Sequence, residues 1–403
     1  MKKRRYGELI MEAPRHVAYS GSEFYLDATG VNMVRYVGAS HRSDTTDYVL
    51  EMFSHDNGRT WTEPGKIVES WEEDGNLHTR ATTSTFIDAE RRITIQVGTE
   101  TRQDKMVVIT HLKYTRPIYR FSFDGGKTWT KAKYLIQNGD KYDWDHYAEG
   151  IVYGKRMAAY PGTGMIKLAS GNWLMPYQTA PLDESGADFY NPHGAYGFFN
   201  TGVFIGTWNE AGDDLVWEKG EELTIDADLS SRGLTEPGIV QLKDGRVVMT
   251  MRGSNSRIEN QKGVKWISVS EDEGRTWSKP WELTFDDGST MYSPATMNKL
   301  IRHSNGRIYW SGNIVPENPA GNMPRHPFQV AEFDEEKLTI KKDTVQIVAD
   351  KEEGDWDDIQ FSNYGMYEDR VTGDLVFTMC ALPEINYEDW TGHLYRYRVK
   401  VTE

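Results

Sequence analysis

The octapeptide SHDNGRTW at residues 54–61 returns as SFDGGKTW at 122–129 and as SEDEGRTW at 270–277. All three copies share the pattern Ser-x-Asp-x-Gly-x-Thr-Trp, and their starts are separated by 68 and 148 residues. Because the second gap is about twice the first, we expect a further copy between them. The stretch WNEAGDDLVW (208–217) keeps an acidic residue, a Gly and a Trp, and we interpret it as a degenerate copy.

A second repeat consists of a short turn that leads into an apolar strand. Its six copies are DATGVNMVRY (27–36), DAERRITIQV (88–97), LASGNWLMPY (168–177), LKDGRVVMTM (242–251), HSNGRIYWSG (303–312) and RVTGDLVFTM (370–379). Each copy is typical of a hairpin turn followed by a buried strand, although Arg91 replaces the Gly in the second. Six copies of one all-strand unit predict an all-β, six-bladed β-propeller that forms a single domain over residues 1–403.

The last segment, LYRYRVKV (394–401), alternates well enough to be a final strand. We expect it to close the ring by joining a blade that begins at the N-terminus. The octapeptide itself predicts a hairpin staple, because Gly permits positive φ in a tight turn and the Asp carboxylate accepts hydrogen bonds from N–H groups further along the turn. The Trp ring is then free to fold back between strands.

Composition excludes several classes of protein. The chain has 46 basic and 61 acidic residues, a net charge of −15, and no basic run after its first five residues, so it lacks the basic face of a nucleic-acid binder. The lone Cys380 excludes an intramolecular disulfide framework. No segment has the length of a membrane span, and no apolar run follows the basic start. We expect a cytoplasmic protein, or a periplasmic or secreted one if an export signal has been removed.

The three octapeptides resemble the Asp-box, or BNR repeat, of the sialidase (neuraminidase) superfamily. This resemblance implies a sialidase-like propeller that hydrolyses glycosidic bonds, with its active site away from the boxes. The segment RGLTEPGIVQLKDGRVVMTMRGS (232–254) is similar to the sialidase segment in which a Glu polarises a tyrosine nucleophile and an Arg binds the substrate carboxylate. The resemblance assigns these roles to Glu236 and Arg252. It also assigns carboxylate binding to Arg325, in GNMPRHPFQVAEFDEE (321–336).

This chain departs from the family pattern in two features. No Phe/Tyr-Arg-Ile-Pro motif supplies a third arginine near the N-terminus, and Arg15, Arg35 or Arg42 are the possible substitutes. In DDIQFSNYGMYEDR (357–370), Phe361 occupies the position of the tyrosine nucleophile. Tyr364 is three residues later, and the hypothesis is that its hydroxyl has taken over that role.

Acid–base candidates lie in three loops. In WEEDGNLHTRATTSTF (71–86), Asp74 is the family-like general acid, while His78 and Arg80 share one face of a strand because their spacing is two residues. Histidine transfers protons readily near neutral pH. The segments DWDHYAEG (143–150) and YNPHGAYG (190–197) add His146 and His193 as candidate substrate-binding residues. No metal-binding motif is present, and no cofactor is expected.

Three functions remain open at this point. The first is an exo-acting glycoside hydrolase that removes a terminal acidic sugar. The second is a polysaccharide lyase acting on uronic-acid-containing glycans, with His78 or Tyr364 as the base. The third is a non-catalytic glycan-binding propeller. All three require a glycan partner, and none involves a nucleic acid or a membrane.

Overall fold

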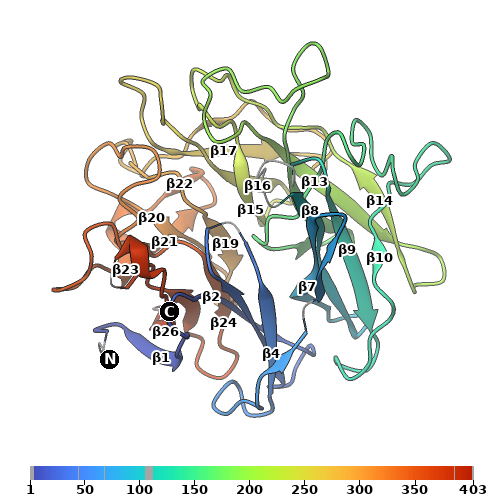
Figure 1. Cartoon of the computed structure of the whole chain (residues 1–403), viewed down its shortest axis with the longest axis horizontal. Helices are drawn as coiled ribbons and strands as arrows, with labels where there is room; N and C mark the ends of the chain where they lie inside the picture. The colour runs from blue at the N-terminus through green and yellow to red at the C-terminus, as the bar shows by residue number, and fades with distance from the viewer. Residues whose placement is uncertain (1–3, 44, 68, 105–111, 385, 402–403) are drawn as a thin grey trace.

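The computed structural model describes residues 4–43, 45–67, 69–104, 112–384 and 386–401. Within these ranges the chain forms six antiparallel sheets, arranged as the blades of a propeller, and no α-helix. The colours of Figure 1 follow the chain once around the ring. The prediction of an all-β, six-bladed propeller is confirmed. The two helical turns of the described chain, Lys342–Thr344 and Tyr387–Asp389, are single 3-10 turns, and neither has the length to cross a membrane.

The blades are numbered in chain order. Blade 1 contains β2 (Ala18–Tyr25), β3 (Met33–Ser40), β4 (Tyr48–Ser54) and β5 (Gly65–Lys66), and blade 2 contains β6 (Glu69–Glu73), β7 (Asn76–Asp88), β8 (Ile93–Asp104), β9 (Thr115–Ser122) and β10 (Lys133–Tyr134). Blade 3 contains β11 (Ile166–Lys167), β12 (Trp173–Thr179), β13 (Asn200–Trp208) and β14 (Leu215–Lys219). Blade 4 contains β15 (Thr235–Gln241), β16 (Val247–Arg252), β17 (Lys265–Ser270) and β18 (Trp281–Glu282). Blade 5 contains β19 (Lys299–Arg302), β20 (Ile308–Asn313), β21 (Phe328–Asp334), β22 (Thr339–Ile340) and β23 (Gln346–Ala349).

Blade 6 closes the ring from both ends of the chain. It contains β24 (Tyr364–Glu368), β25 (Leu375–Cys380), β26 (Leu394–Val399) and, at its outer edge, β1 (Gly7–Met11). β1 pairs antiparallel to β26, which confirms the expected closure.

Strands are counted outward from the strand nearest the axis of each blade, which is β7 in blade 2. In this count, the six predicted turns connect the first and second strands of the six blades. Gly171, Gly245 and Gly306 adopt positive φ there, at 95°, 95° and 82°. In the second copy, where Arg91 replaces Gly, the left-handed position moves to Arg92 with φ 57°. The turn of the second copy therefore differs from the others in which residue adopts positive φ, as the replacement of Gly by Arg91 indicated.

The octapeptides connect the third and fourth strands of blades 1, 2 and 4, and WNEAGDDLVW makes the same connection in blade 3. In the last copy, Asp272 accepts hydrogen bonds from the backbone N–H of Thr276 at 2.8 Å and from its hydroxyl at 2.6 Å. The Ser270 hydroxyl accepts from the Gly274 N–H at 2.7 Å. In the first copy, the Trp61 indole N–H folds back to donate to its own Gly58 carbonyl at 3.0 Å. The predicted hairpin staple is therefore confirmed.

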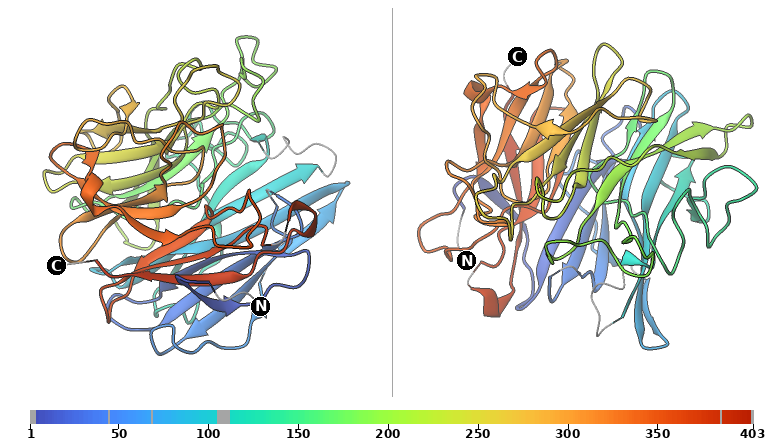
Figure 2. Two further views of the ribbon diagram at one scale, coloured as in Figure 1. Left: turned by 90° about the vertical axis from the view of Figure 1, so that its left-hand side faces the viewer. Right: turned by 90° about the horizontal axis from the view of Figure 1, so that it is seen from above.

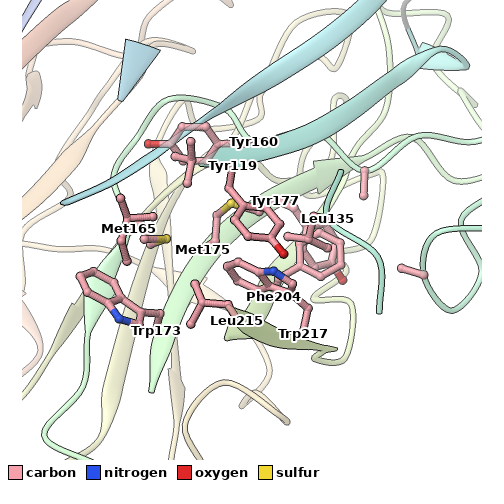
Figure 3. Close-up of a cluster of buried hydrophobic side chains, with 14 of the residues drawn as sticks. Tyr119, Leu135, Tyr160, Met165, Trp173, Met175, Tyr177, Phe204, Leu215 and Trp217 are labelled. Atoms are coloured by element: carbon pink, nitrogen blue, oxygen red, sulfur yellow. The ribbon is translucent and has the colours of Figure 1, made fainter. Parts of the chain in front are cut away.

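Apolar side chains fill the space between neighbouring blades. Figure 3 shows the cluster between blades 2 and 3, where the Tyr119 and Trp217 rings meet edge to face at 5.5 Å and the Tyr177 and Phe204 rings lie 4.8 Å apart. Because each blade packs on both neighbours, the ring holds its axial strands in fixed positions.

The strands nearest the axis all run in the same direction. A cavity around the axis is lined by the last residues of β2, β7, β11, β15, β19 and β24, so these strands end at one face of the propeller and begin at the other. We call the face where they begin the entry face. The turns between first and second strands, and the octapeptides, therefore lie at the opposite face.

Candidate functional site

Glu236 lies at the entry face, at the start of the axial strand of blade 4. Its φ is 48°, in the left-handed region that costs a residue other than glycine about 1–3 kcal/mol. The neighbouring backbone is fixed on both sides. Gln178 Oε1 accepts a hydrogen bond from the Glu236 N–H at 3.2 Å, and the Thr163 hydroxyl donates to the Pro237 carbonyl. A register shift between Thr235 and Gly238 bends the strand here, so the Glu236 side chain leaves the regular alternation of the sheet.

Arg252 forms the main contact of Glu236. It is the last residue of β16 and lies opposite Thr235 in the strand register. Its Nη1 donates to both carboxylate oxygens of Glu236, at 3.0 Å and 2.9 Å, and its Nη2 donates to Asn322 Oδ1 at 3.3 Å. The two side chains are 11% and 19% exposed, so the pair is only partly reached by solvent.

Arg325 approaches from blade 5, in the loop before β21. Its Nη1 donates to Gln360 Oε1 at 2.9 Å and to the Ser362 hydroxyl at 3.3 Å, and its Nε donates to the Asn322 carbonyl at 3.2 Å. Asn322 thus accepts from Arg252 through its side chain and from Arg325 through its backbone. The two arginines are held in one network across blades 4 and 5.

A third arginine near Glu236 comes from a position that the sequence did not single out. Burial raises the pKa of the Glu236 carboxyl, but the Arg252, Arg325 and Arg232 guanidinium groups outweigh burial and leave that pKa below its ordinary value. The Arg232 guanidinium also lies over the ring of Tyr196, 5.2 Å from its centroid. Arg232 is only four residues before Glu236, and this short spacing could have indicated that the two residues lie near each other.

The N-terminal substitutes for this arginine are placed elsewhere. Arg35 is buried against Glu23, with Nη2 2.6 Å from the carboxylate, and Arg15 is an exposed partner of Asp389 at 3.3 Å. Arg42 lies in the exposed loop between β3 and β4, where its carbonyl accepts from the Thr45 hydroxyl.

Lys265 is a further basic residue in the same environment. It is fully buried at the start of β17, and its ammonium donates to the Pro294 carbonyl at 2.7 Å. Burial and the positive charges of Arg252 and Arg325 lower its pKa well below the ordinary value, although Glu236 acts in the opposite direction.

Tyr364 is the first residue of β24, and its side chain lies between blades 5 and 6. Its hydroxyl is 2.8 Å from the Ser311 hydroxyl and donates to the Ser311 carbonyl at 3.0 Å. Burial raises the pKa of this phenol above its ordinary value. A nucleophile activated by Glu236 requires a hydrogen bond between the two residues, whereas the hydrogen bonds described here pair Tyr364 with Ser311 and Glu236 with Arg252.

Phe361 is fully buried in the core of blade 6. Its ring lies 5.2 Å from the guanidinium of Arg4, on the N-terminal segment. The position that the resemblance gives to the tyrosine nucleophile is therefore a core position in this chain.

The candidates of residues 71–86 lie on a hairpin that extends blade 2. β6 and the first half of β7 form this hairpin, and Figure 2 shows the long strands of blade 2 projecting beyond their neighbours. Asp74 is at its exposed tip, and His78 stacks on Trp71 with ring centroids 5.1 Å apart. Arg80 forms an ion pair with Glu100 at 2.8 Å and donates to the Tyr134 hydroxyl at 2.9 Å. These residues interact with one another and with blade 2 in the described contacts, and Glu236 interacts with none of them.

The two remaining histidines lie in separate entry-face loops. His146 meets the ring of Tyr142 edge to face at 5.3 Å. His193 is 3.0 Å from a carboxylate oxygen of Asp228. The loop that carries His193 also supplies Tyr196, whose ring contacts Arg232.

A cavity of about 560 Å³ opens beside this network. Its lining includes Arg232 and Asn322 from the network, together with Tyr196, Asn255, Asn318 and Met323. An arginine and an exposed aromatic ring beside a carboxylate are suited to a sugar with an acidic group, because the guanidinium binds carboxylates and the ring can pack on the sugar. Among the described residues, no group of three or more His, Cys, Asp or Glu side chains is placed to hold a metal ion.

The chain belongs to the BNR repeat-like domain family, whose sequence profile matches residues 88–340. Together with the propeller, this match makes it a BNR-repeat propeller, and BNR repeats are what the octapeptides indicated. A comparison with curated protein sequences gives no significant match.

Three solved structures illustrate the likeness of fold. A protein of unknown function from Dyadobacter fermentans is 14% identical, with a TM-score of 0.60 over 99% of both chains. The NanB sialidase from Streptococcus pneumoniae is 12% identical, with a TM-score of 0.62 over all of this chain and 71% of the sialidase. The GH93 α-L-arabinofuranosidase of Fusarium graminearum is 12% identical, with a TM-score of 0.57 over 99% of this chain and 98% of the enzyme. At these identities the comparison defines the fold, which is one that glycoside hydrolases use.

Proposed function

We propose that this protein is an exo-acting glycoside hydrolase that removes a terminal acidic sugar from a glycan. Arg232, Arg252 and Arg325 bind the carboxylate of that sugar, and Glu236 is the catalytic carboxylate. The observation that carries the proposal is the pair of Arg252 with Glu236, joined to Arg325 through Asn322, around a carboxylate that is held in a left-handed backbone conformation. Non-glycine residues in such conformations cluster at active sites.

Charge balance favours an anionic substrate. Arg252 pairs with Glu236, and the positive charges of Arg325 and Arg232 also lower the pKa of that carboxyl, so the surroundings of Glu236 are rich in positive charge. Arginine presents a planar fork of donors that matches a carboxylate. A bound sugar acid would share Arg252 with Glu236, and the freed carboxylate oxygen would then face the sugar. The sialidase and the arabinofuranosidase described above support hydrolysis of a glycosidic bond on this fold, while the choice of an acidic sugar rests on the arginines.

A glycan-binding propeller without catalysis is the second candidate. It is favoured by the placement of Phe361, which occupies the expected position of the nucleophile, and of Tyr364, which was expected to replace it. Tyr364 is sealed against Ser311, and Phe361 faces Arg4. The lyase hypothesis is weaker, because its bases are this same Tyr364 and His78, which stacks on Trp71 in the blade 2 hairpin.

One panel of acidic glycans tests these functions together. Free reducing sugar reports hydrolysis, ultraviolet absorbance of an unsaturated uronate reports elimination, and calorimetry reports binding. We expect hydrolysis that Glu236→Gln abolishes. Glu222→Gln is the matched control, because Glu222 is also a buried carboxylate paired with an arginine, Arg156, but belongs to blade 3. Binding without product, unchanged by Glu236→Gln, would establish the second candidate instead.

A further inference from the structure

The axial channel contains a second cavity, of about 690 Å³, at the end of the axial strands opposite the entry face. All six blades contribute to its wall, and its lining residues do not include Glu236 or the three arginines around it. Much of the wall is apolar, from Phe24, Phe86, Met165, Ile239, Leu300 and Met366. This cavity is therefore separate from the proposed catalytic site.

The basic residues at the outer end of this cavity are paired with charges of the opposite sign. The pairs are Lys167 with Asp88 and Glu90, Lys243 and Arg302 with Glu335, and Arg370 with Asp27, while the Glu368 carboxylate accepts a hydrogen bond from the Ser304 N–H at 2.9 Å. Deeper in the wall, the Glu23 carboxylate lies 2.6 Å from Arg35 and 2.9 Å from Arg396. These charges are compensated within the protein.

Lys299 differs from all of them. It begins β19 at the inner end of the cavity and is 9% exposed. Among the described residues, none accepts a hydrogen bond from its ammonium, and none places a carboxylate within ion-pair distance of it. Its ammonium lies over the face of the Tyr364 ring, 5.2 Å from the centroid. Burial lowers the pKa of Lys299 to about 8, so the amine still carries its charge for most of the time at pH 7.

We propose that this cavity binds a small monocarboxylate with an apolar body, whose carboxylate pairs with the ammonium of Lys299. A buried charge without a partner is costly, and a ligand that supplies the partner recovers that cost on binding. Only one uncompensated cation faces the cavity from the described wall, so a single negative charge matches it. The apolar side chains between Lys299 and the outer end then surround the rest of the ligand.

The ligand enters with its carboxylate first. Lys299 lies at the inner end of the cavity, whereas Lys243, Arg302 and Arg370 lie at the outer end with the turns between first and second strands. Because the outer basic residues are already paired with carboxylates, an anion would exchange solvent for the ion pair with Lys299 only as it moves inward. Its apolar body would meet Leu300 and Met366 along the way.

Octanoate is a suitable probe, with octanol as its uncharged counterpart. In calorimetric titrations of the full-length protein, we expect octanoate to bind at least tenfold more tightly than octanol. Lys299→Met should reduce octanoate affinity at least tenfold and leave octanol binding unchanged. Lys243→Met, which removes a lysine already paired with Glu335, is the matched control and should change octanoate affinity little. Equal affinity of the Lys299→Met variant and the unmodified protein for octanoate would overturn the proposal, as would the absence of octanoate binding.

A second measurement follows the Lys299 amine by NMR in the unmodified sequence and uses a variant only to assign its resonance. Lysines labelled by reductive methylation with ¹³C give separate resonances, and that of Lys299 is assigned by its absence from Lys299→Arg. Octanoate should raise the pKa of the Lys299 amine, because the carboxylate stabilises the charged form. A titration of Lys299 that is identical with and without saturating octanoate would show that the carboxylate does not reach it.

Discussion

Arg252 Nη1 lies 3.0 Å and 2.9 Å from the two carboxylate oxygens of Glu236, and this pair joins the end of β16 to the start of β15 at the entry face. The same guanidinium reaches Asn322 in blade 5 through Nη2. Arg252 therefore has two contacts: it compensates a buried carboxylate, and it donates to Asn322, which lines the cavity in which we place the substrate. Arg325 donates to Gln360 and Ser362, and it reaches the same network through the Asn322 carbonyl.

The carboxylate-binding role predicts different losses for acid and ester substrates. Arg252→Ala and Arg325→Ala should each weaken a sugar acid by about 2–5 kcal/mol, the cost of breaking a buried charged contact, and its methyl ester only slightly. Affinities measured by calorimetry for acid and ester test this. Arg156→Ala, which removes the partner of Glu222, should affect neither. Equal losses for the two substrates would show that the arginines do not bind a carboxylate.

The hairpin staples predict a loss of stability without a loss of function. Asp272→Ala removes acceptors for the Thr276 N–H, the Thr276 hydroxyl and the Ser270 hydroxyl. We expect the free energy of unfolding to fall by about 1–3 kcal/mol, because each such bond contributes about 1 kcal/mol. Chemical denaturation measures this change, and Glu271→Ala, an exposed neighbour in the same octapeptide, is the control. Activity should be unchanged, because the staple lies at the face opposite Glu236.

Acid should weaken the first two staples in a defined pH range. Hydrogen bonds from the hydroxyl and N–H of Thr60 lower the pKa of Asp56 to about 2, and the N–H and hydroxyl of Thr128 lower that of Asp124 to about 2. The ordinary carboxyl pKa is about 3.9, so these residues contribute their full stability above about pH 4. That contribution should be lost as the pH falls from about 4 to about 2. Asp56→Asn and Asp124→Asn should flatten the pH dependence of unfolding in this range, and an unchanged slope would contradict the assignment.

The fold was predictable because it depends on local turn chemistry repeated along the chain. The six turns and the octapeptides each contain the residues that their own hairpin needs, so no knowledge of distant contacts was required. Glu236 and Arg252 were linked for a similar reason, since one hairpin carries both. Arg232 was not predicted, because the family pattern places the third arginine near the N-terminus. Its role depends on how the chain before β15 bends toward the cavity, which no periodicity reveals.

The direction of the Tyr364 side chain also could not be predicted from the sequence. Tyr364 begins an axial strand, as a channel-facing nucleophile would, but a residue on such a strand can face the axis or a neighbouring blade. Packing against Phe328 and Phe377 selects the space between blades 5 and 6, with ring centroids 4.5 Å and 6.1 Å from that of Tyr364. This choice depends on side chains that are far apart in the chain.

The placement of Tyr364 leads to the last prediction. Tyr364→Phe should keep the catalytic activity and lower the free energy of unfolding by about 1–2 kcal/mol, because it removes the contacts of the phenol with both the hydroxyl and the carbonyl of Ser311. Ser311→Ala removes only the hydroxyl contact and should cost less, and the double variant should cost little more than Tyr364→Phe alone. Turnover of the sugar acid and denaturation curves for the three variants provide the test. If Tyr364→Phe abolishes turnover while Ser311→Ala preserves it, the phenol oxygen takes part in the reaction, and the loop before β24 must rearrange to bring it to Glu236.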